Sequence, residues 1–327
     1  MNRSRVLAYV AFATVCVLWG TTYLGIAIAI ETLPTFLFAG TRFTAAGVIL
    51  LTISLLAGQR LPERRSDWLN LALIGLLLVG VGNLAVVWAE HFLPSSFAAL
   101  LVALAPFWMA VLESLRKDGE RLTPRKLTGL IIGFAGVAIL VAPRLRGGTL
   151  AASFLLGVGA LQCGSIAWNL GSIRSKYHLS KTLSPLIAAS LQMISGGVVL
   201  SIIGLSRGEA ARFVFSNRSL LAFLYLMIFG SIVAYAAYVY ALSHLKTSLV
   251  STYAYVNPVV AVILGWLVLH EPIGWNVVLA MVVIFSGVAL VQTGGRHRLS
   301  SAGAATAIVK PAAVEASIPE DEGRWVR

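Results

Sequence analysis

The sequence predicts an all-α polytopic membrane protein whose ten transmembrane helices form two inverted five-helix repeats. Three observations lead to this fold class. The composition is too apolar for a water-soluble core, ten apolar stretches are long enough to cross a bilayer, and the second half of the chain repeats motifs of the first half.

The composition places the chain in lipid. Hydrophobic residues make up 58% of its 327 residues and charged residues 12%, whereas soluble domains average about 45–50% apolar and about 25% charged residues. So much apolar surface does not fit inside one water-soluble core, so we expect the lipid bilayer to be a partner. Both cysteines lie in apolar stretches and lack the spacing of metal ligands. We therefore expect two small buried hydrophobic residues, with neither a metal nor a cofactor.

The ten apolar stretches set the positions of the predicted spans. About 20 apolar residues in a helix cross the hydrocarbon core, which is about 30 Å thick. The first stretch follows a short basic segment, as in a signal peptide, but it is long enough to remain as an uncleaved helix. The predicted spans are Val6–Ile28, Thr35–Leu56, Trp68–Ala89, Ser95–Leu115, Arg125–Val141, Leu150–Leu170, Leu183–Leu205, Leu220–Leu242, Thr247–Leu269 and Trp275–Thr293.

The basic residues predict the orientation of these spans. With the N-terminus in the cytoplasm, 19 of the 25 Lys and Arg residues lie on the cytoplasmic side, 5 lie outside and one, Arg42, lies within a span. This asymmetry follows the positive-inside rule. It predicts a multi-pass protein of the inner (plasma) membrane with both termini and the Arg116–Lys126 loop in the cytoplasm. The net charge of +12 then reflects topology, and we expect no nucleic acid partner, since no basic stripe is present.

Motifs of the first half recur in the second half at a nearly constant offset of about 151 residues. Pro106 matches Pro258, and the Phe134–Ala138 segment matches Phe285–Ala289. The first repeat is predicted over residues 6–142 and the second over residues 150–293. Because each repeat holds an odd number of spans, the second one enters the membrane from the opposite side. Inverted repeats of this kind are typical of carriers that expose one site to the two sides of the membrane in turn.

Residues 294–327 follow the last span and contain many Ala, Ser and Gly residues. A segment of this composition cannot form a core, so it is predicted to be a disordered cytoplasmic tail. An inert tail is favoured over a regulatory one. Small residues such as Gly129 and Gly133 fit either packing within the chain or a dimer face, so a homodimer is compatible with the sequence and is not required.

Several of these residues together resemble a known family. They are the Trp19–Tyr23 segment, Arg42, Pro106, Pro258, Glu120 and Glu271. Their pattern resembles the EamA-type transporters of the drug/metabolite transporter superfamily, and in particular the YedA-like subgroup of bacterial inner membranes. The resemblance implies ten helices around a central cavity, formed mainly by spans one, three, four, six, eight and nine. It also implies a role in exporting amino acids and related metabolites.

Polar and aromatic residues on single helical faces predict the lining of that cavity. Residues three, four and seven positions apart share a face of a helix. Each of these residues could instead have a purely structural role. The aromatic residues could lie at the membrane interface, and the polar residues could form a seam between helices. Asn83 could bond to a neighbouring helix. The candidate substrate-binding residues are Trp19, Thr22, Tyr23, Asn83, Gln162, Trp168, Asn169, Tyr235, Tyr238, Thr252 and Tyr255.

Two prolines and one arginine stand apart from these faces. Pro106 and Pro258 are predicted to kink spans four and nine at matching positions, either for gating or merely for structure. Arg42 lies inside a span, where an unpaired charge is costly. It either holds a carboxylate of the solute or pairs with Glu31 or Glu90, and the structural role is favoured.

The function predicted from these features is secondary transport of small neutral, zwitterionic or aromatic solutes, including amino acids, by alternating access, with export as the favoured direction. No acidic residue lies at mid-span, which disfavours large cations as solutes. Proton coupling would have to use Glu31, Glu90 or His91. The alternatives are a multidrug or amine carrier of the same fold, in which aromatic rings bind the amine, a channel, and a membrane-embedded enzyme. The last is disfavoured because no catalytic cluster lies within the spans.

Overall fold

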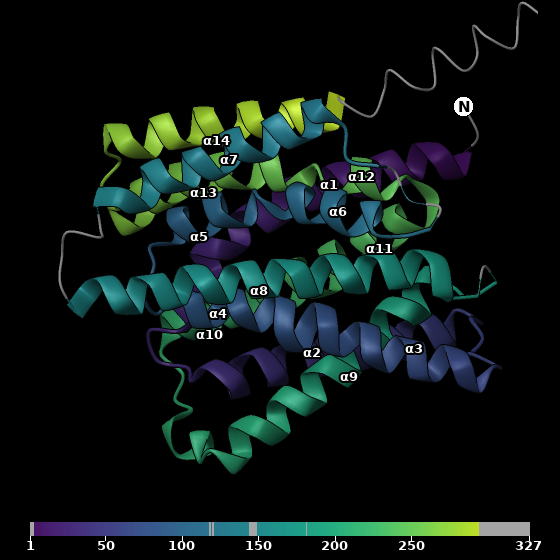
Figure 1. Cartoon of the computed structure of the whole chain (residues 1–327). Helices are drawn as coiled ribbons and strands as arrows, with labels where there is room; N and C mark the ends of the chain where they lie inside the picture. Colours follow the sequence, from purple (N-terminus) through teal and green to yellow (C-terminus); the bar gives the residue numbers. More distant parts are fainter. Residues whose placement is uncertain (1–2, 118, 120, 144–148, 181, 294–327) are drawn as a thin grey trace, which may run out of the picture.

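The computed structural model describes residues 3–117, 119, 121–143, 149–180 and 182–293. Within these residues the chain is helical and contains no β-strand. The helices lie lengthwise beside one another in a bundle, with α7 and α14 along one side and α2, α3 and α9 along the other (Figure 1). The predicted tail, Glu120, Arg144 and Arg146 lie outside the described residues.

Four of the ten predicted spans are interrupted helices. The third and eighth spans each contain a π-helical stretch, and the fourth and ninth are each broken into two α-helices. In chain order the helices are α1 (Arg3–Ala29), α2 (Thr35–Leu56), α3 (Arg65–Gly75), η1 (Leu76–Asn83), α4 (Leu84–Ala89), α5 (Ser95–Val102), α6 (Ala105–Ser114), α7 (Pro124–Val141), α8 (Thr149–His178), α9 (Pro185–Ser206), η3 (Glu209–Arg212), α10 (Asn217–Tyr225), η4 (Leu226–Val233), α11 (Ala234–His244), α12 (Thr247–Val250), α13 (Tyr253–Leu269) and α14 (Trp275–Thr293).

The helices have the length and composition of membrane spans. Eight continuous or joined helices are long and apolar enough to cross a bilayer, and the apolar helices Tyr253–Leu269 and Trp275–Val291 are shorter. Many large apolar side chains are exposed along these helices, for example Ile131 on α7 and Leu221 on α10. Such surface is unfavourable in water and favourable in lipid. The chain is therefore a multi-pass membrane protein.

The bounds of several helices recur in the second half of the chain. α2 and α9 have the same length of 22 residues, and the π-helical stretches η1 and η4 each have eight residues. Gly58 and Gly208 follow α2 and α9 with φ angles of 76° and 70°. This left-handed conformation favours glycine and ends both helices.

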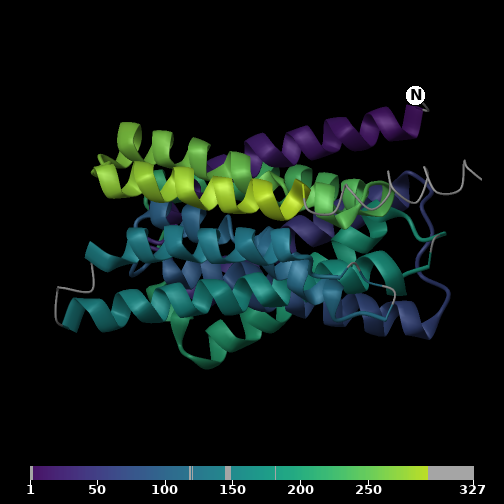
Figure 2. The same cartoon turned by 45° about the horizontal axis from the view of Figure 1, so that its top comes forward.

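Helices that match between the halves also pack directly against each other. α2 lies along α9, and α7 lies along α14; the α7–α14 pair stays together in the turned view of Figure 2. A Cβ atom on Gly129 would lie 2.5 Å from the carbonyl oxygen of Gly287. A Cβ atom on Gly287 would lie 2.5 Å from the backbone nitrogen of Gly133. The small residues of α7 therefore serve packing within the chain.

Polar groups at the helix ends explain where several helices begin. The Thr123 hydroxyl accepts a hydrogen bond from the Lys126 backbone at the start of α7, and Ser216 and Ser219 form a reciprocal cap on α10. The Glu271 carboxylate accepts hydrogen bonds from the backbone N–H and hydroxyl groups of both Ser95 and Ser96. These bonds satisfy donors that the first turn of α5 leaves free.

The two ends of the described chain lie toward the same end of the bundle. α1 begins there and α14 ends there, as Figures 1 and 2 show. The connection between α2 and α3 and the end of α8 lie at that end too (Figure 1). α7 ends and α8 begins at the opposite end, which we call the distal end (Figure 1).

Candidate solute-binding cavity

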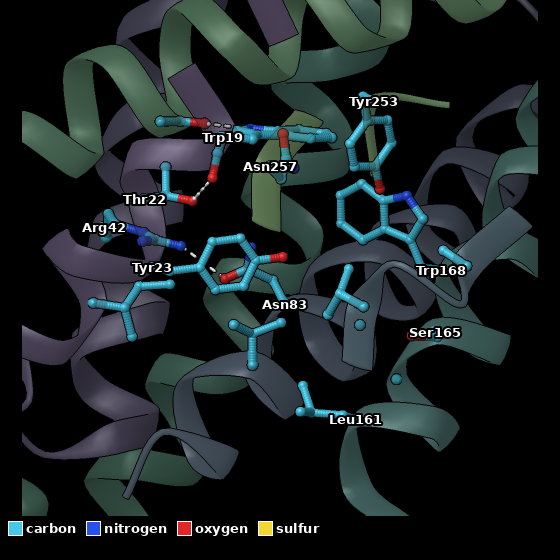
Figure 3. Close-up of a pocket in the computed structure, with 17 residues that line it drawn as sticks. Trp19, Thr22, Tyr23, Arg42, Asn83, Leu161, Ser165, Trp168, Tyr253 and Asn257 are labelled. Carbon is cyan, nitrogen blue, oxygen red and sulfur yellow. Dashed lines mark hydrogen bonds between the residues drawn. The ribbon is translucent and has the colours of Figure 1, made fainter. Parts of the chain in front are cut away.

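A cavity lies between α1, α2, α4, α8 and α13 (Figure 3). Its volume is about 70 Å³. One buried water needs about 10–15 Å³ by this measure, so the cavity holds a handful of waters in this conformation.

Six residues singled out from the sequence line this cavity. Trp19, Thr22 and Tyr23 share one face of α1, as their spacing predicts, and Ile26 continues that face. The other three come from different helices and meet the α1 face across the cavity (Figure 3). They are Arg42 on α2, Asn83 at the end of η1 and Trp168 on α8.

Six other candidates lie outside the lining. They pack behind the cavity walls or bond to backbone groups near it. These residues are Gln162, Asn169, Tyr235, Tyr238, Thr252 and Tyr255.

Four aromatic rings from both halves of the chain pack together beside the cavity, and all of them except Tyr238 line it. We call them the aromatic cluster; they are Trp19, Trp168, Tyr238 and Tyr253. The Trp19 ring centroid lies 5.4 Å from that of Trp168, 5.0 Å from Tyr238 and 4.9 Å from Tyr253. Aromatic pairs at such separations are favourable beyond their burial. In Figure 3 the rings of Trp19, Trp168 and Tyr253 lie on one side of the cavity and Arg42 and Tyr23 on the other.

Hydrogen bonds fix the two tryptophan rings. Trp19 Nε1 donates to the carbonyl oxygen of Gly230 in η4 at 3.1 Å. Trp168 Nε1 donates to the hydroxyl of Tyr238 at 3.1 Å, and that hydroxyl also bonds to Ser172. Buried indole N–H groups need such partners. Both rings line the cavity.

Gln162 and Asn169 support the break in the fourth span. The Gln162 amide donates to the carbonyl oxygen of Leu101 at 3.3 Å and accepts from Trp108 Nε1 at 2.9 Å. The Asn169 amide donates to the carbonyl oxygen of Ala105 at 3.1 Å. Carbonyl groups at a helix break inside a membrane need donors, and these two amides supply them.

Tyr235 is held behind Trp168. Its hydroxyl donates to the Gln192 side chain on α9 at 3.1 Å, and its ring lies 6.2 Å from that of Trp168. Tyr235 is 1% exposed and its neighbour Tyr238 is 2% exposed. Both support the cavity wall from behind.

The broken spans reach the cavity at their breaks. α5 ends at Val102 and α6 begins at Ala105, and both residues line the cavity. Pro106, in the first turn of α6, cannot donate to the Val102 carbonyl. The break therefore lies beside the first of the two prolines.

The second break lies further from its proline. α12 ends at Val250 and α13 begins at Tyr253, whereas Pro258 lies inside α13. The helical face predicted for this span assumes one continuous helix, so the break interrupts it. Thr252 donates to the Leu249 carbonyl at 2.6 Å, and the Tyr255 ring faces Phe285 on α14. Instead, Tyr253 and Asn257, one turn apart, line the cavity.

Arg42 is the charged residue of the lining. Its side chain is 2% exposed, and its guanidinium donates to the Asn83 side-chain oxygen at 2.7 Å. The guanidinium carbon lies 4.3 Å from the Phe43 ring centroid, and the Nε atom has no hydrogen-bond partner within the described residues. Glu31, one of the partners expected from the sequence, forms an ion pair with Arg218 at 3.5 Å.

Sequence reasoning missed Tyr253 and Asn257 as lining residues. With its nitrogen as donor, the Asn257 amide reaches the carbonyl oxygens of Cys16 at 3.0 Å and Tyr253 at 3.2 Å. The signal for Asn257 was its place directly before Pro258, which indicates a kink and not a lining residue. Tyr253 carried no such signal, because the sequence does not reveal the break at 251–252 that decides which residues share a helical face with it.

His91 lies outside the spans and near the distal end. Its Nε2 atom is hydrogen-bonded to the Thr35 hydroxyl at 2.7 Å. Burial lowers the pKa of His91 below its usual value, against an opposing effect of Glu209. The neutral imidazole is therefore favoured at neutral pH.

Comparison with known proteins identifies the family. The model of the EamA-like transporter family matches residues 6–142 and 155–293. The "Uncharacterized inner membrane transporter YedA" of Escherichia coli strain K12 is 40% identical over 280 residues, which cover 85% of this chain and 88% of that protein. The "Uncharacterized transporter YvbV" of Bacillus subtilis is 25% identical over 92% of this chain and 96% of its own length.

More distant proteins share the fold. The chloroplastic WAT1-related protein At3g02690 of Arabidopsis thaliana is 25% identical over 77% of this chain and 61% of that protein. A solved crystal structure superposes with a TM-score of 0.65 at 19% identity, covering 90% of this chain and 99% of that one. With two family matches that span most of its length, the chain is an EamA-type member of the drug/metabolite transporter superfamily, similar to YedA.

Proposed function

We propose that this chain is a secondary transporter that exports small neutral, zwitterionic or aromatic metabolites, such as amino acids, by alternating access. The observation that carries the proposal is the cavity at the breaks of the fourth and ninth spans, lined by both halves of the chain. Discontinuous helices at such depth are typical of transporter binding sites. The family and the names of its relatives support a transporter over an enzyme.

The chemistry of the lining supports the solute class. Trp19, Tyr23 and Tyr253 offer ring faces, Asn83 offers an amide, and Arg42 offers a guanidinium donor. An amino acid matches this set, because its carboxylate suits the guanidinium and its side chain suits the rings. An amine drug matches it less well, because the lining carries a positive charge and no carboxylate.

The proposed mechanism uses the two halves as inverted repeats of residues 6–142 and 150–293. The recurrence of α2 as α9 and of η1 as η4 supports this arrangement. Exchange of conformation between the halves would open the cavity first to one side of the membrane and then to the other. Both termini are proposed to lie in the cytoplasm of a cell whose inner membrane holds the protein.

A ligand-stabilisation screen tests the proposal. The purified full chain is heated in mild detergent with each member of a panel of amino acids, aromatic acids and quaternary amines. A bound solute raises the apparent melting temperature by mass action. Amino acids are expected to stabilise the protein, and hits are then tested for exchange across vesicles that contain the protein.

The matched control is Trp275→Ala. Trp275 is 87% exposed at the start of α14 and does not line the cavity, so this variant should keep the stabilisation seen with the unchanged chain. Trp19→Ala should lose it. Stabilisation by amines alone, or retention of amino acid binding in Trp19→Ala, would contradict the proposed solute class.

A further inference from the structure

Glu90 lies one helical turn beyond Val86, which lines the cavity. It follows α4, and its backbone N–H bonds to the carbonyl of Val86 one turn earlier. Val86 and Asn83 line the cavity, and residues at these spacings share one face of a helix. The Glu90 side chain therefore continues the wall that Asn83 and Val86 begin.

This carboxyl group is buried and has no partner. Glu90 is 8% exposed, and neither carboxylate oxygen has a hydrogen-bond partner within the described part of the chain. Its surroundings include the buried residues Ala89 and Leu93. An ionised carboxylate without hydrogen bonds in such a place is strongly disfavoured, whereas the neutral acid is tolerated.

The charged and titratable groups that act on Glu90 come from three other elements. Arg42 on α2 attracts a charge on Glu90, and Glu271 after α13 repels it. Tyr23 on α1 also interacts with it electrostatically. At the same end, His91 faces Thr35, and Glu31 pairs with Arg218.

The two carboxyl groups have opposite environments. Glu271 accepts four hydrogen bonds at the start of α5. Glu90 accepts none, and Arg42 already donates to Asn83. Without hydrogen bonds of its own and repelled by Glu271, the Glu90 carboxyl group favours its neutral form. The proton therefore belongs on Glu90.

We propose that Glu90 is the proton-binding site of the transport cycle. In the compact cavity seen here Glu90 is the neutral acid. When the distal end opens, water reaches the carboxyl group, the O–H bond breaks, and the proton leaves to that water while the electron pair stays on the carboxylate. Arg42 then faces a charged Glu90, and a proton must return before the cavity closes. The inference rests on the proposed function, because it couples this proton to solute movement.

Infrared difference spectroscopy tests the proton site directly. The full chain in lipid vesicles is titrated from acidic to alkaline pH while the C=O band of protonated carboxyl groups is followed. The unchanged chain should show a band that persists at neutral pH and disappears at higher pH. Glu90→Gln should lack this band, and Glu31→Gln, which changes an exposed and ion-paired carboxylate, should keep it.

A second variant covers the case in which Glu90→Gln does not fold. Glu90→Asp keeps a titrating acid on a shorter side chain, so its band should move in frequency and in titration midpoint. A band that is the same in the unchanged chain and in both Glu90 variants would overturn the proposal.

Vesicle transport separates this inference from the proposed function. Exchange of a mixture of radiolabelled neutral amino acids is measured with and without a pH gradient. A gradient should drive accumulation in the unchanged chain, and Glu90→Gln should lose that component while exchange without a gradient continues. Exchange that never responds to the gradient would overturn the coupling and leave the carrier function intact. A titrating Glu90 band without any amino acid exchange would support the proton site and contradict the proposed function.

Discussion

Trp19 on α1 and Trp168 on α8 meet edge to face beside the cavity, with ring centroids 5.4 Å apart and an interplanar angle of 82°. They come from the first span of each half of the chain. Each indole N–H donates to the eighth span, Trp19 to a backbone carbonyl and Trp168 to a hydroxyl. The contact thus ties the first and sixth spans to one partner helix.

Replacing each tryptophan by phenylalanine should have unequal effects on stability. Trp19→Phe leaves the Gly230 carbonyl in η4 without its side-chain donor, and we expect this loss to cost about 1–3 kcal/mol. Trp168→Phe leaves the Tyr238 hydroxyl still bonded to Ser172, so we expect about 0.5–1.5 kcal/mol. Chemical unfolding in mild detergent, followed by circular dichroism, measures both. Equal losses would contradict the role given to the Gly230 bond.

Arg42→Lys should weaken solute binding while keeping the positive charge. Lysine cannot reproduce the planar fork that donates to Asn83 and packs on the Phe43 ring. Loss of one charge-assisted bond to a carboxylate corresponds to about 10- to 100-fold in affinity. The matched control is Arg207→Lys, which changes an arginine that packs on Phe36 away from the cavity. Calorimetric titration with an amino acid hit measures both, and equal affinities in the two variants would argue against a carboxylate at Arg42.

Glu271→Gln should destabilise the start of α5. The amide keeps one acceptor oxygen in place of two, so part of the set of bonds from Ser95 and Ser96 is lost. We expect a loss of about 1–3 kcal/mol, measured by unfolding as above. Glu31→Gln removes a surface pair with Arg218 and should change the free energy of unfolding by about 0–1 kcal/mol. A larger effect at Glu31 than at Glu271 would refute the capping role.

The lowered pKa of His91 predicts a loss of stability in acid. When the folded chain has the lower pKa, the unfolded chain binds more protons between the two values, so stability rises with pH there. The contribution of His91 is therefore present above the unfolded value of 6.5 and is lost as the pH falls below it. Melting temperatures measured across this window should fall less in His91→Gln than in the unchanged chain. If the melting temperatures of the two proteins fell in parallel with pH, another group would control the acid sensitivity of stability.

Pro258→Ala should slow transport more than it lowers the yield of folded protein. Pro258 lies inside α13, where it cannot donate to the Ala254 carbonyl, and alanine would restore that bond and stiffen the helix. Amino acid exchange per folded molecule measures the effect, with Pro106→Ala as the matched change in the other half. An unchanged exchange rate in Pro258→Ala would remove the gating role.

The sequence predicted most of the helices because each one is long, apolar and followed by a turn or a charge. The EamA-type family, predicted from a few residues in and beside the spans, is confirmed by the family match. The face of α1 was also predictable, because α1 is one continuous helix, and Trp19, Thr22 and Tyr23 meet at the cavity as their spacing requires.

The spacing of residues along the sequence predicted the cavity-lining face poorly in spans that are not one continuous α-helix. Tyr235 and Tyr238 follow η4, whose π-helical turns rotate the later residues away from the face expected for an α-helix. Thr252 lies at the break between α12 and α13, and Tyr255 lies beyond it, so the face that ends in Tyr255 was counted across a discontinuity. Neither interruption carries a clear local signal, since packing against other helices decides where they occur.

The seam between α2 and α9 is so closely packed that it has no room for a Cβ atom at Gly47 or Gly197. A Cβ on Gly47 would lie 2.8 Å from the Ser190 carbonyl oxygen, and one on Gly197 would lie 2.6 Å from the Thr44 backbone nitrogen. Helices packed this closely resist sliding along each other, because any shift would bring backbone atoms into steric clash. We therefore expect the proposed rearrangement to occur as rotation around this seam, with Arg42 on α2 moving less than the opposite walls of the cavity.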